Sequence, residues 1–202
     1  MLFAALVALG YLLGSLPFGY WLPRLLAGVD IRTVGSGNTG ATNVWRALGF
    51  KLGLAVALLD IAKGAAAALL ARWLADDLAG VLAGLAAMGG HYRPIFLRFA
   101  RGGKAVATIG GVGLALAFFA TFSAVGVWIA VFLVTRYASV ASIVSALTLP
   151  LFALLFGTSI PVLAFTLAGA VAVILLHRGN IRRLRAGTEN RIQLRRRAVA
   201  RA

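Results

Sequence analysis

The stretch GLAVALLDIAKGAAAALLARWL, residues 53–74, decides the fold class of this chain. About 20 mostly apolar residues are enough to cross a bilayer as one helix, and a helix pairs every backbone polar group within the segment. Asp60 and Lys63 interrupt the stretch, and charges inside a span are energetically costly and normally paired or functional. Their i,i+3 spacing places both on one helical face. We therefore expect a structural ion pair here, in preference to a direct role in substrate binding.

The rest of the chain has the same apolar character. Hydrophobic residues make up 61% of the 202 residues, charged residues make up 12%, and the mean hydropathy is +0.95, far from the composition of a soluble domain. The pattern predicts an all-α integral membrane protein, a bundle of about seven transmembrane helices. The first run lacks the basic flank and the cleavage site of a signal peptide, so we expect it to remain as a helix. We place the spans at residues 2–22, 53–74, 79–97, 105–120, 122–135, 138–156 and 160–177, with ATFSA (120–124) as the turn between the fourth and the fifth.

Lysine and arginine gather in one set of connections between these spans. The connection before residue 53, the one around 98–104 and the C-terminal segment are basic, whereas the connection at 157–159 carries no charge. Basic connections mark the cytoplasmic side of a membrane protein. We therefore expect the N-terminus outside and the C-terminus in the cytoplasm. In this interpretation residues 1–192 form one membrane domain, and 193–202 form a basic cytoplasmic tail that lies against anionic lipid heads.

Composition also excludes several classes of function. The chain has no cysteine, two histidines and five acidic residues, so neither a disulfide framework nor a zinc or di-iron centre is expected. The formal net charge is +15, but the basic residues punctuate apolar runs and do not form the basic face of a soluble domain. We interpret them as membrane flanks and expect no nucleic-acid partner.

A glycine-rich polar loop, VGSGNTGATN at residues 34–43, separates the first two spans. Its glycines permit unusual backbone angles, so successive N–H groups can point at an anion, and its hydroxyls and carboxamides add further donors. A simple turn between helices needs only about two to eight residues. This loop is longer, and it contains neither proline nor an acidic residue. We interpret it as a phosphate-binding segment, with a flexible turn as the alternative.

Two further segments are expected at the same cytoplasmic level. RGGK (101–104) places two glycines and a mobile ammonium just before a helix, which is another arrangement that binds anions, although its basic residues also fit simple membrane flanks. His177 and Asn180 are related by i,i+3 spacing, so they share one helical face and can bind one ligand together. Glu189 is expected to orient the basic tail, and His91 to cap or pack the end of the third span.

Three motifs, in this order along the chain, resemble the PlsY family of bacterial membrane glycerol-3-phosphate acyltransferases. They are GSGNTGATN (35–43), GHYRPIFLRFARGGKAVAT (90–108) and HRGNIRRLRAGTEN (177–190). The resemblance implies an enzyme of the bacterial inner membrane whose active site faces the cytoplasm. Such an enzyme moves a fatty acyl group from acyl phosphate to the 1-hydroxyl of sn-glycerol 3-phosphate. The products are lysophosphatidic acid and phosphate, and the reaction is the first acylation of phospholipid synthesis.

The resemblance also implies partners and site residues. The partners are acyl phosphate, glycerol 3-phosphate and membrane lipids, with a functional link to the enzyme that produces acyl phosphate, and no cofactor is implied. Either His177 or the substrate's own phosphate removes the hydroxyl proton, and the sequence leaves both open. By match to the motifs, the catalytic residues are His177, Asn180 and Lys104, and the substrate-binding residues are Ser36, Gly37, Asn38, Gly40, Thr42, Asn43, Arg46, Gly102, Gly103 and Ser142.

The chain departs from the family pattern in three places. Ala100 and Arg101 stand before the two glycines where the family has one lysine, which makes the spacing from His91 to Lys104 one residue longer. Ala105 follows Lys104 where the family has glycine, and Gly179 stands where the family has glutamate. These changes bear on the geometry around the site more than on the reaction itself.

Two other functions compete with acyl transfer. A small transporter for phosphate or an organic anion would use the same donors, but transport favours a site at mid-depth, and the polar motifs are expected at one face. A purely structural subunit would leave the convergent motifs unexplained. The His-x4-Asp pair of the soluble and peripheral acyltransferases of the same pathway is excluded, because Phe96 and Arg182 stand five residues after the two histidines.

Overall fold

The computed structural model describes residues 1–192, and this part of the chain is helical apart from its connections. The basic tail at 193–202 lies outside the described residues. The α-helices are α1 (Leu2–Gly14), α2 (Phe18–Ala27), α3 (Ala41–Leu48), α4 (Phe50–Leu74), α5 (Asp77–Tyr92), α6 (Val106–Leu116), α7 (Phe118–Thr135), α8 (Ala138–Leu155), α9 (Ile160–Leu176) and α10 (Arg178–Arg185), and two short 3-10 helices are η1 (Ile31–Thr33) and η2 (Ile95–Leu97).

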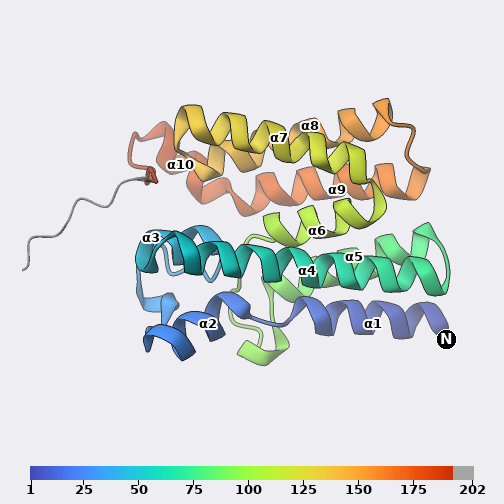
Figure 1. The fold of residues 1–202 in the computed structure, drawn as a ribbon, viewed down its shortest axis with the longest axis horizontal. Helices are drawn as coiled ribbons and strands as arrows, with labels where there is room; N and C mark the ends of the chain where they lie inside the picture. Colours follow the sequence, from blue (N-terminus) through green and yellow to red (C-terminus); the bar gives the residue numbers. More distant parts are fainter. Residues whose placement is uncertain (193–202) are drawn as a thin grey trace, which may run out of the picture.

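The long helices lie side by side in two groups joined by α6 (Figure 1). Helices α1, α4 and α5 pack against one another, α7, α8 and α9 form the second group, and α6 contacts α4, α5, α7 and α9. The N-terminus of α1 lies at one end of the bundle, while α2, α3 and α10 lie at the other (Figure 1). The short amphipathic helices and the basic segments between them are therefore gathered at a single end.

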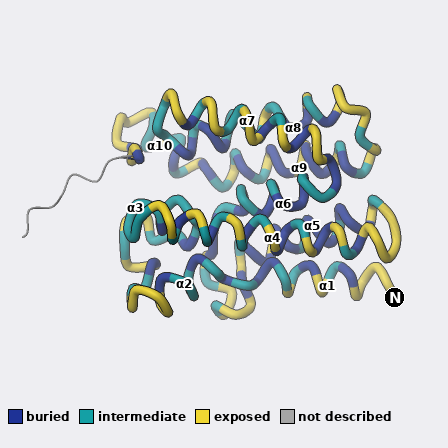
Figure 2. Tube along the Cα trace, in the orientation of Figure 1, coloured by how far each residue is buried: buried dark blue, intermediate teal, exposed yellow. Residues whose placement is uncertain are grey.

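Helix length and composition support membrane insertion. The segments Leu2–Ala27, Phe50–Leu74, Phe118–Thr135 and Ala138–Leu155 are long and apolar enough to cross a bilayer, and α9 with α10, bent by 53° between them, makes a fifth candidate. Exposed apolar residues of these helices include Leu58, Phe122 and Leu155. Figure 2 shows exposed positions recurring along the outer helices. Apolar surface of this extent fits contact with lipid rather than water. The prediction of an all-helical integral membrane protein is confirmed.

Several predicted spans have different boundaries in the structure. The run at 2–22 is divided into α1 and α2 at Ser15–Pro17, because proline disfavours helical geometry at the residue before it. The predicted turn ATFSA (120–124) is wrong: those residues lie inside α7, and the chain turns instead at Ala117, whose backbone is non-helical at φ −144° and ψ 64°. Gly113 lies opposite Thr121 at this turn, where a Cβ would come within 2.5 Å of the threonine hydroxyl.

The connection between α5 and α6 reaches further into the bundle than the sequence predicts. The predicted span 79–97 ends at Tyr92, just before Pro94, and α6 has only 11 residues. At 1.5 Å per residue, α6 is about 16 Å long, well short of a hydrocarbon core of about 30 Å. Figure 1 shows this connection meeting the bundle part-way along α4. Lys104 therefore belongs to a loop enclosed by helices.

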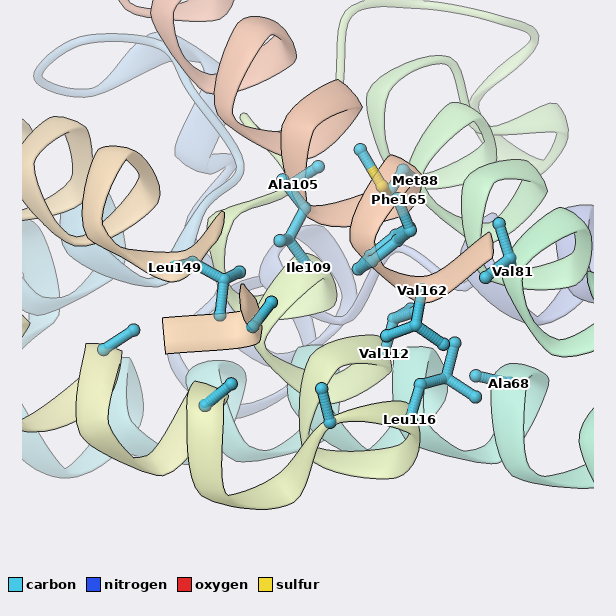
Figure 3. Close-up of a cluster of buried hydrophobic side chains, with 14 of the residues drawn as sticks. Ala68, Val81, Met88, Ala105, Ile109, Val112, Leu116, Leu149, Val162 and Phe165 are labelled. Carbon is cyan, nitrogen blue, oxygen red and sulfur yellow. The ribbon is translucent and has the colours of Figure 1, made fainter. Parts of the chain in front are cut away.

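The core lies around α6. Ile109, Val112 and Leu116 of α6 pack with Val81 of α5 and Phe165 of α9 in one buried cluster (Figure 3). Helices α4 and α6 approach closely enough that a Cβ at Gly111 would lie 2.0 Å from the carbonyl oxygen of Ile61. Small residues at such crossings allow tight van der Waals packing in a membrane. This packing fixes α6, and so the loop that precedes it.

Candidate active site

One cavity of about 400 Å³ joins the polar motifs to the apolar interior. Its wall comes from the loop before α3, from the loop before α6 and from helices α3 to α10. The lining combines polar and cationic side chains with apolar side chains and glycine. The polar side chains are Ser36, Asn38, Thr42, Asn43, Arg46, Asp60, His91, Lys104, Thr121, Ser139, Ser142, Ser145, His177, Asn180 and Arg183, and the apolar residues include Leu54, Ala57, Ile61, Val106, Ile109, Gly110, Leu114, Val125, Leu149 and Val173.

Lys104 projects from the loop that precedes α6. The next residue, Ala105, adopts a left-handed backbone conformation with φ 58°, so the chain turns sharply into the helix. The ammonium of Lys104 donates a hydrogen bond to Oδ1 of Asn180. Burial lowers the pKa of Lys104 to about 8, with Glu189 opposing that shift and neighbouring arginines adding to it. The site therefore holds the ammonium of Lys104, whose charge is only partly balanced by neighbouring protein groups.

Glu189 organises the side chains around Lys104. Its Oε1 accepts hydrogen bonds from Nδ2 of Asn180 at 2.6 Å and from Oγ of Ser139 at 3.0 Å, and its Oε2 accepts from Nε of Arg183 at 2.7 Å. Burial opposes ionisation, but the hydrogen bonds from Asn180, Ser139 and Arg183 outweigh it, so the pKa of Glu189 falls below its usual value. The carboxylate thus fixes the amide of Asn180 so that its oxygen faces Lys104.

His177 lies at the bend between α9 and α10 and is buried in the cavity wall. Its Nδ1 lies 2.8 Å from the carbonyl oxygen of Val173. A carbonyl only accepts, so this contact places the proton of the neutral ring on Nδ1. Nε2 is then left with a lone pair, and His177 is suited to accept a hydrogen bond or a proton from a ligand.

The loop at 34–43 is held together by its own carboxamides. Nδ2 of Asn43 donates to the carbonyls of Val34 and Asn38, each at 3.0 Å, and Oδ1 of Asn43 accepts from the backbone N–H of Ser36 at 3.1 Å. Oδ1 of Asn38 accepts from the N–H of Gly40 at 2.8 Å, and its Nδ2 donates to the carbonyl of Gly102 at 3.1 Å. The two asparagines therefore shape the loop and join it to the RGGK segment.

Comparison with known proteins shows the family of this chain. A sequence model described as glycerol-3-phosphate acyltransferase matches residues 4–187. This chain belongs to that family. It is 48% identical over 190 residues to a glycerol-3-phosphate acyltransferase of Synechococcus sp. (strain JA-3-3Ab), covering 94% of this chain and 93% of the relative. It is 43% identical over 192 residues to one from Carboxydothermus hydrogenoformans, covering 95% and 96%.

Two solved structures are similar along nearly their whole length. Both are crystal structures of PlsY (YgiH), an integral membrane glycerol 3-phosphate acyltransferase. The glycerol 3-phosphate form gives a TM-score of 0.89 at 42% identity, covering 95% of this chain and 96% of that one. The lysophosphatidic acid form gives 0.87 at 41% identity, covering 95% of each chain. The resemblance of the sequence motifs to the PlsY family is confirmed.

The motif residues of this acyltransferase converge on the cavity, with three exceptions. Gly37, Gly102 and Gly103 are not part of the wall, and the last two lie against His91 just before Lys104. The other ten predicted residues are all in the wall: Ser36, Asn38, Gly40, Thr42, Asn43, Arg46, Lys104, Ser142, His177 and Asn180.

Two of these residues have partners that the sequence did not indicate. Oγ of Ser142 accepts from Nε1 of Trp128 at 3.1 Å and donates to the carbonyl of Ala138 at 2.7 Å, so its proton is already engaged. Arg46 donates through Nη2 to the carbonyl of Asn190 at 3.3 Å. Ser142 can therefore offer a ligand only a lone pair, whereas the guanidinium of Arg46 keeps further donors.

Sequence reasoning missed several residues of this acyltransferase site. Ser139 and Arg183 line the cavity and bind Glu189, which was expected only to orient the tail. The signal was present: Ser139 precedes Ser142 by one helical turn, and Arg183 follows Asn180 by the same spacing. Among residues 1–192, no group of three or more His, Cys, Asp or Glu side chains is placed to hold a metal ion.

Proposed function

We propose that this protein transfers a fatty acyl group from acyl phosphate to the 1-hydroxyl of sn-glycerol 3-phosphate, giving lysophosphatidic acid and phosphate. The observation that carries the proposal is a cavity lined both by cationic and amide side chains and by many apolar ones. Both substrates carry a phosphate, and one carries an acyl chain. The names of the two similar crystal structures, a glycerol 3-phosphate form and a lysophosphatidic acid form, support the same acceptor and product.

The proposed reaction is one displacement at the acyl carbonyl carbon. The 1-hydroxyl oxygen of glycerol 3-phosphate forms the new ester bond, and the bond from the carbonyl carbon to the phosphate oxygen breaks. Negative charge develops on the carbonyl oxygen and then on the departing phosphate. Lys104, Arg46 and Arg183 line the cavity, and positioned cations of this kind stabilise such charge best in an enclosed site. Asn180 and Ser142 are assigned to holding the substrates against these cations.

The hydroxyl proton has two acceptors in this proposal. Nε2 of His177 carries a lone pair if the contact to the carbonyl of Val173 fixes the proton on Nδ1. A phosphate oxygen of the substrate is the other acceptor, because it lies on the same small molecule as the hydroxyl. Replacement of His177 by alanine separates the two: a general base contributes typically 10² to 10⁴ in rate, whereas loss of a binding contact raises the KM for glycerol 3-phosphate.

We also propose seven membrane spans within a domain of residues 1–192, with the N-terminus outside and the C-terminus in the cytoplasm. The distribution of lysine and arginine supports this orientation. In the same proposal the protein lies in the bacterial inner membrane, its cavity is reached from the cytoplasm, and residues 193–202 contact anionic lipid. Acyl phosphate is supplied by a separate enzyme, with which this protein has a functional link.

Acyl transfer by the purified protein tests the proposed function. The detergent-solubilised protein is mixed with labelled glycerol 3-phosphate and either acyl phosphate or acyl-CoA, and labelled lysophosphatidic acid is measured. We expect product with acyl phosphate only. Turnover with acyl-CoA and none with acyl phosphate would show that the protein is an acyltransferase but that acyl-CoA is its donor. Uptake of labelled phosphate or glycerol 3-phosphate into proteoliposomes, without acyl transfer from either donor, would support the transporter instead.

A further inference from the structure

Three ionisable side chains are buried together next to the loop that carries Lys104, and two of them, Asp60 and His91, also line the cavity. Asp60 and Lys63 belong to α4 and His91 to α5, and their exposed fractions are 2%, 5% and 6%. Nζ of Lys63 lies 2.8 Å from Oδ1 of Asp60, and Nδ1 of His91 lies 3.5 Å from the same oxygen. Charges at this depth in a membrane protein are normally paired or functional. The predicted ion pair is therefore present, but it has a third member.

Lys63 connects this cluster to the break between α1 and α2. Its ammonium donates a hydrogen bond of 2.8 Å to the carbonyl oxygen of Leu16, in the segment that separates the two helices. That carbonyl has no helical partner, because the N–H of Tyr20, which a continuous helix would direct to it, donates to the carbonyl of Pro17 at 2.8 Å instead. Lys63 therefore has a structural role that explains its burial, and Asp60 balances its charge. Neither contact explains why His91 faces the same carboxylate.

His91 supports the two residues that precede Lys104. Its carbonyl oxygen accepts from the N–H of Gly103 at 3.3 Å, and the carbonyl of Tyr92 accepts from the N–H of Gly102 at 2.9 Å. Its ring lies directly against Gly103: a Cβ on that glycine would come within 2.0 Å of Nε2. The Gly102–Gly103 backbone is thus held between the imidazole, the end of α5 and the amide of Asn38.

We propose that Asp60 and His91 are positioning residues for Lys104. Asp60 holds the imidazole of His91 in place, the imidazole supports Gly102 and Gly103, and this support sets where the next side chain points. A flexible Gly-Gly pair needs such support, because a glycine backbone has more freedom than any other. The inference rests on the proposed function, since it assigns Lys104 to the reaction. Purely structural stabilisation of the bundle is the alternative.

A double-mutant cycle separates positioning from general stabilisation. The variants are His91→Leu, Lys104→Ala and the two combined, each purified as the full chain and compared by kcat/KM for glycerol 3-phosphate. Misplacement of a reacting group by about 1 Å can lower a rate about 10²-fold, so we expect His91→Leu to lose about 10- to 100-fold. The double variant should be no slower than Lys104→Ala alone. Losses that multiply would overturn the proposal.

Two additional variants guard against a folding artefact. His91→Gln keeps a donor that can face Asp60 and should recover part of the loss, and Asp60→Asn in the same cycle should also be non-additive with Lys104→Ala.

Met88→Ala is the matched control, because Met88 is buried in α5 one turn before His91 and is not part of the cavity wall. It should lower the melting temperature and leave kcat/KM unchanged. The same outcome for His91→Leu would overturn the proposal.

Binding of glycerol 3-phosphate can be measured without catalysis, so it tests the role of His91 separately from the proposed function. Calorimetric titration with glycerol 3-phosphate can be run without any acyl donor on the wild type, His91→Leu, Lys104→Ala and the double variant. We expect the affinity losses of His91→Leu and Lys104→Ala to be non-additive there as well. If the wild-type protein binds glycerol 3-phosphate and fails to transfer an acyl group, the proposed function is wrong, and the binding cycle still decides whether His91 positions Lys104.

Discussion

The ammonium of Lys104 donates a hydrogen bond to the amide oxygen of Asn180, although 76 residues separate them in the sequence. This contact joins the second sequence motif (90–108) to the third (177–190). Asn180 is itself held by Glu189 through its amide nitrogen. The orientation of the amide is therefore fixed from one side by a carboxylate and from the other by a cation, and a phosphate that enters the cavity meets an already ordered Lys104.

Replacing Lys104 by alanine should remove one preorganised charge from the site. Loss of such a partner typically lowers the rate by about 10² to 10³. Lys104→Arg should recover only part of the activity, because a planar guanidinium replaces a compact ammonium. Steady-state kinetics with acyl phosphate and glycerol 3-phosphate give the result. Lys51→Ala is the matched control, since Lys51 is an exposed lysine of α4 outside the cavity wall, and it should behave as wild type.

The pH dependence should report the ammonium of Lys104. Its pKa is lowered to about 8, chiefly by burial, and the charged, protonated form is the one that binds phosphate. The charge is thus present below about pH 8 and is lost as the pH rises above it. We expect kcat/KM for glycerol 3-phosphate to fall about tenfold per pH unit above that value. In Lys104→Arg this decline should disappear up to pH 9.5, because guanidinium stays protonated. An unchanged decline of kcat/KM in Lys104→Arg would show that another titrating group causes it.

Glu189→Gln should weaken both the site and the fold. The carboxylate is buried and accepts hydrogen bonds from Ser139, Asn180 and Arg183, and hydrogen bonds to a charged group contribute about 1.5–3 kcal/mol each. We expect a lower melting temperature and, because Asn180 is no longer oriented, a raised KM for glycerol 3-phosphate.

Asp77→Asn provides the comparison for Glu189→Gln. Asp77 also bridges helices, with Nε of Arg72 at 2.8 Å and Oγ of Ser159 at 2.6 Å, but it lies at the opposite end of α4 and α5 from Glu189 and is partly exposed. It should lower the melting temperature slightly and leave the KM unchanged. Equal changes of KM in the two variants would contradict the assigned role of Glu189.

Gly110→Leu should change which acyl chains are accepted. Gly110 lies in the cavity wall on α6, and a Cβ built there meets no atom within 4 Å. A leucine side chain can therefore enter the apolar part of the cavity without disturbing the helix. We expect kcat/KM to fall more for long acyl phosphates than for short ones. Gly126→Leu is matched, since Gly126 of α7 also faces open space and is not in the wall. The same chain-length profile in both variants would place the acyl chain elsewhere.

Cysteine labelling tests the orientation in the membrane. The natural chain has no cysteine, so single cysteines at Thr33, Arg101 and Arg182 report without further changes. All three positions are exposed, whereas the neighbouring Thr39 is buried and unsuitable. An impermeant maleimide should label them only after the cytoplasmic side is opened. Ala75→Cys, at the exposed end of α4, should be labelled in intact cells. The reverse pattern would invert the proposed topology.

Hydropathy predicted the long helices well, because runs such as Phe50–Leu74 and Ala138–Leu155 keep a high mean hydropathy over more than four turns. The Asp60–Lys63 pair was also predictable, since an i,i+3 spacing constrains two side chains of one helix. The breaks between helices were not predictable from hydropathy. Ala117 ends one helix and begins the next within an apolar run, and only its packing against neighbouring helices decides that it turns there.

Most of the predicted site residues line the cavity, but the contacts between them could not be predicted from the sequence. The motifs placed Lys104 and Asn180 near one another only through family resemblance, because their contact depends on how α6 and α10 pack. Asn43 was expected to face substrate, yet its amide is engaged with three backbone groups of its own loop. No local pattern distinguishes an amide that binds a ligand from one that shapes a loop. That distinction requires the three-dimensional surroundings.

The surplus of cations in the cavity wall has a consequence for the metabolism of a cell that contains this protein. Arg46, Lys104 and Arg183 line the wall, and of these only Arg183 has a direct carboxylate partner among the described residues, Glu189. In the proposed reaction orthophosphate is a product, and it carries the same charged group as the acceptor. We therefore expect it to compete with glycerol 3-phosphate for the same donors, so that the flux into new membrane depends on the concentrations of both solutes.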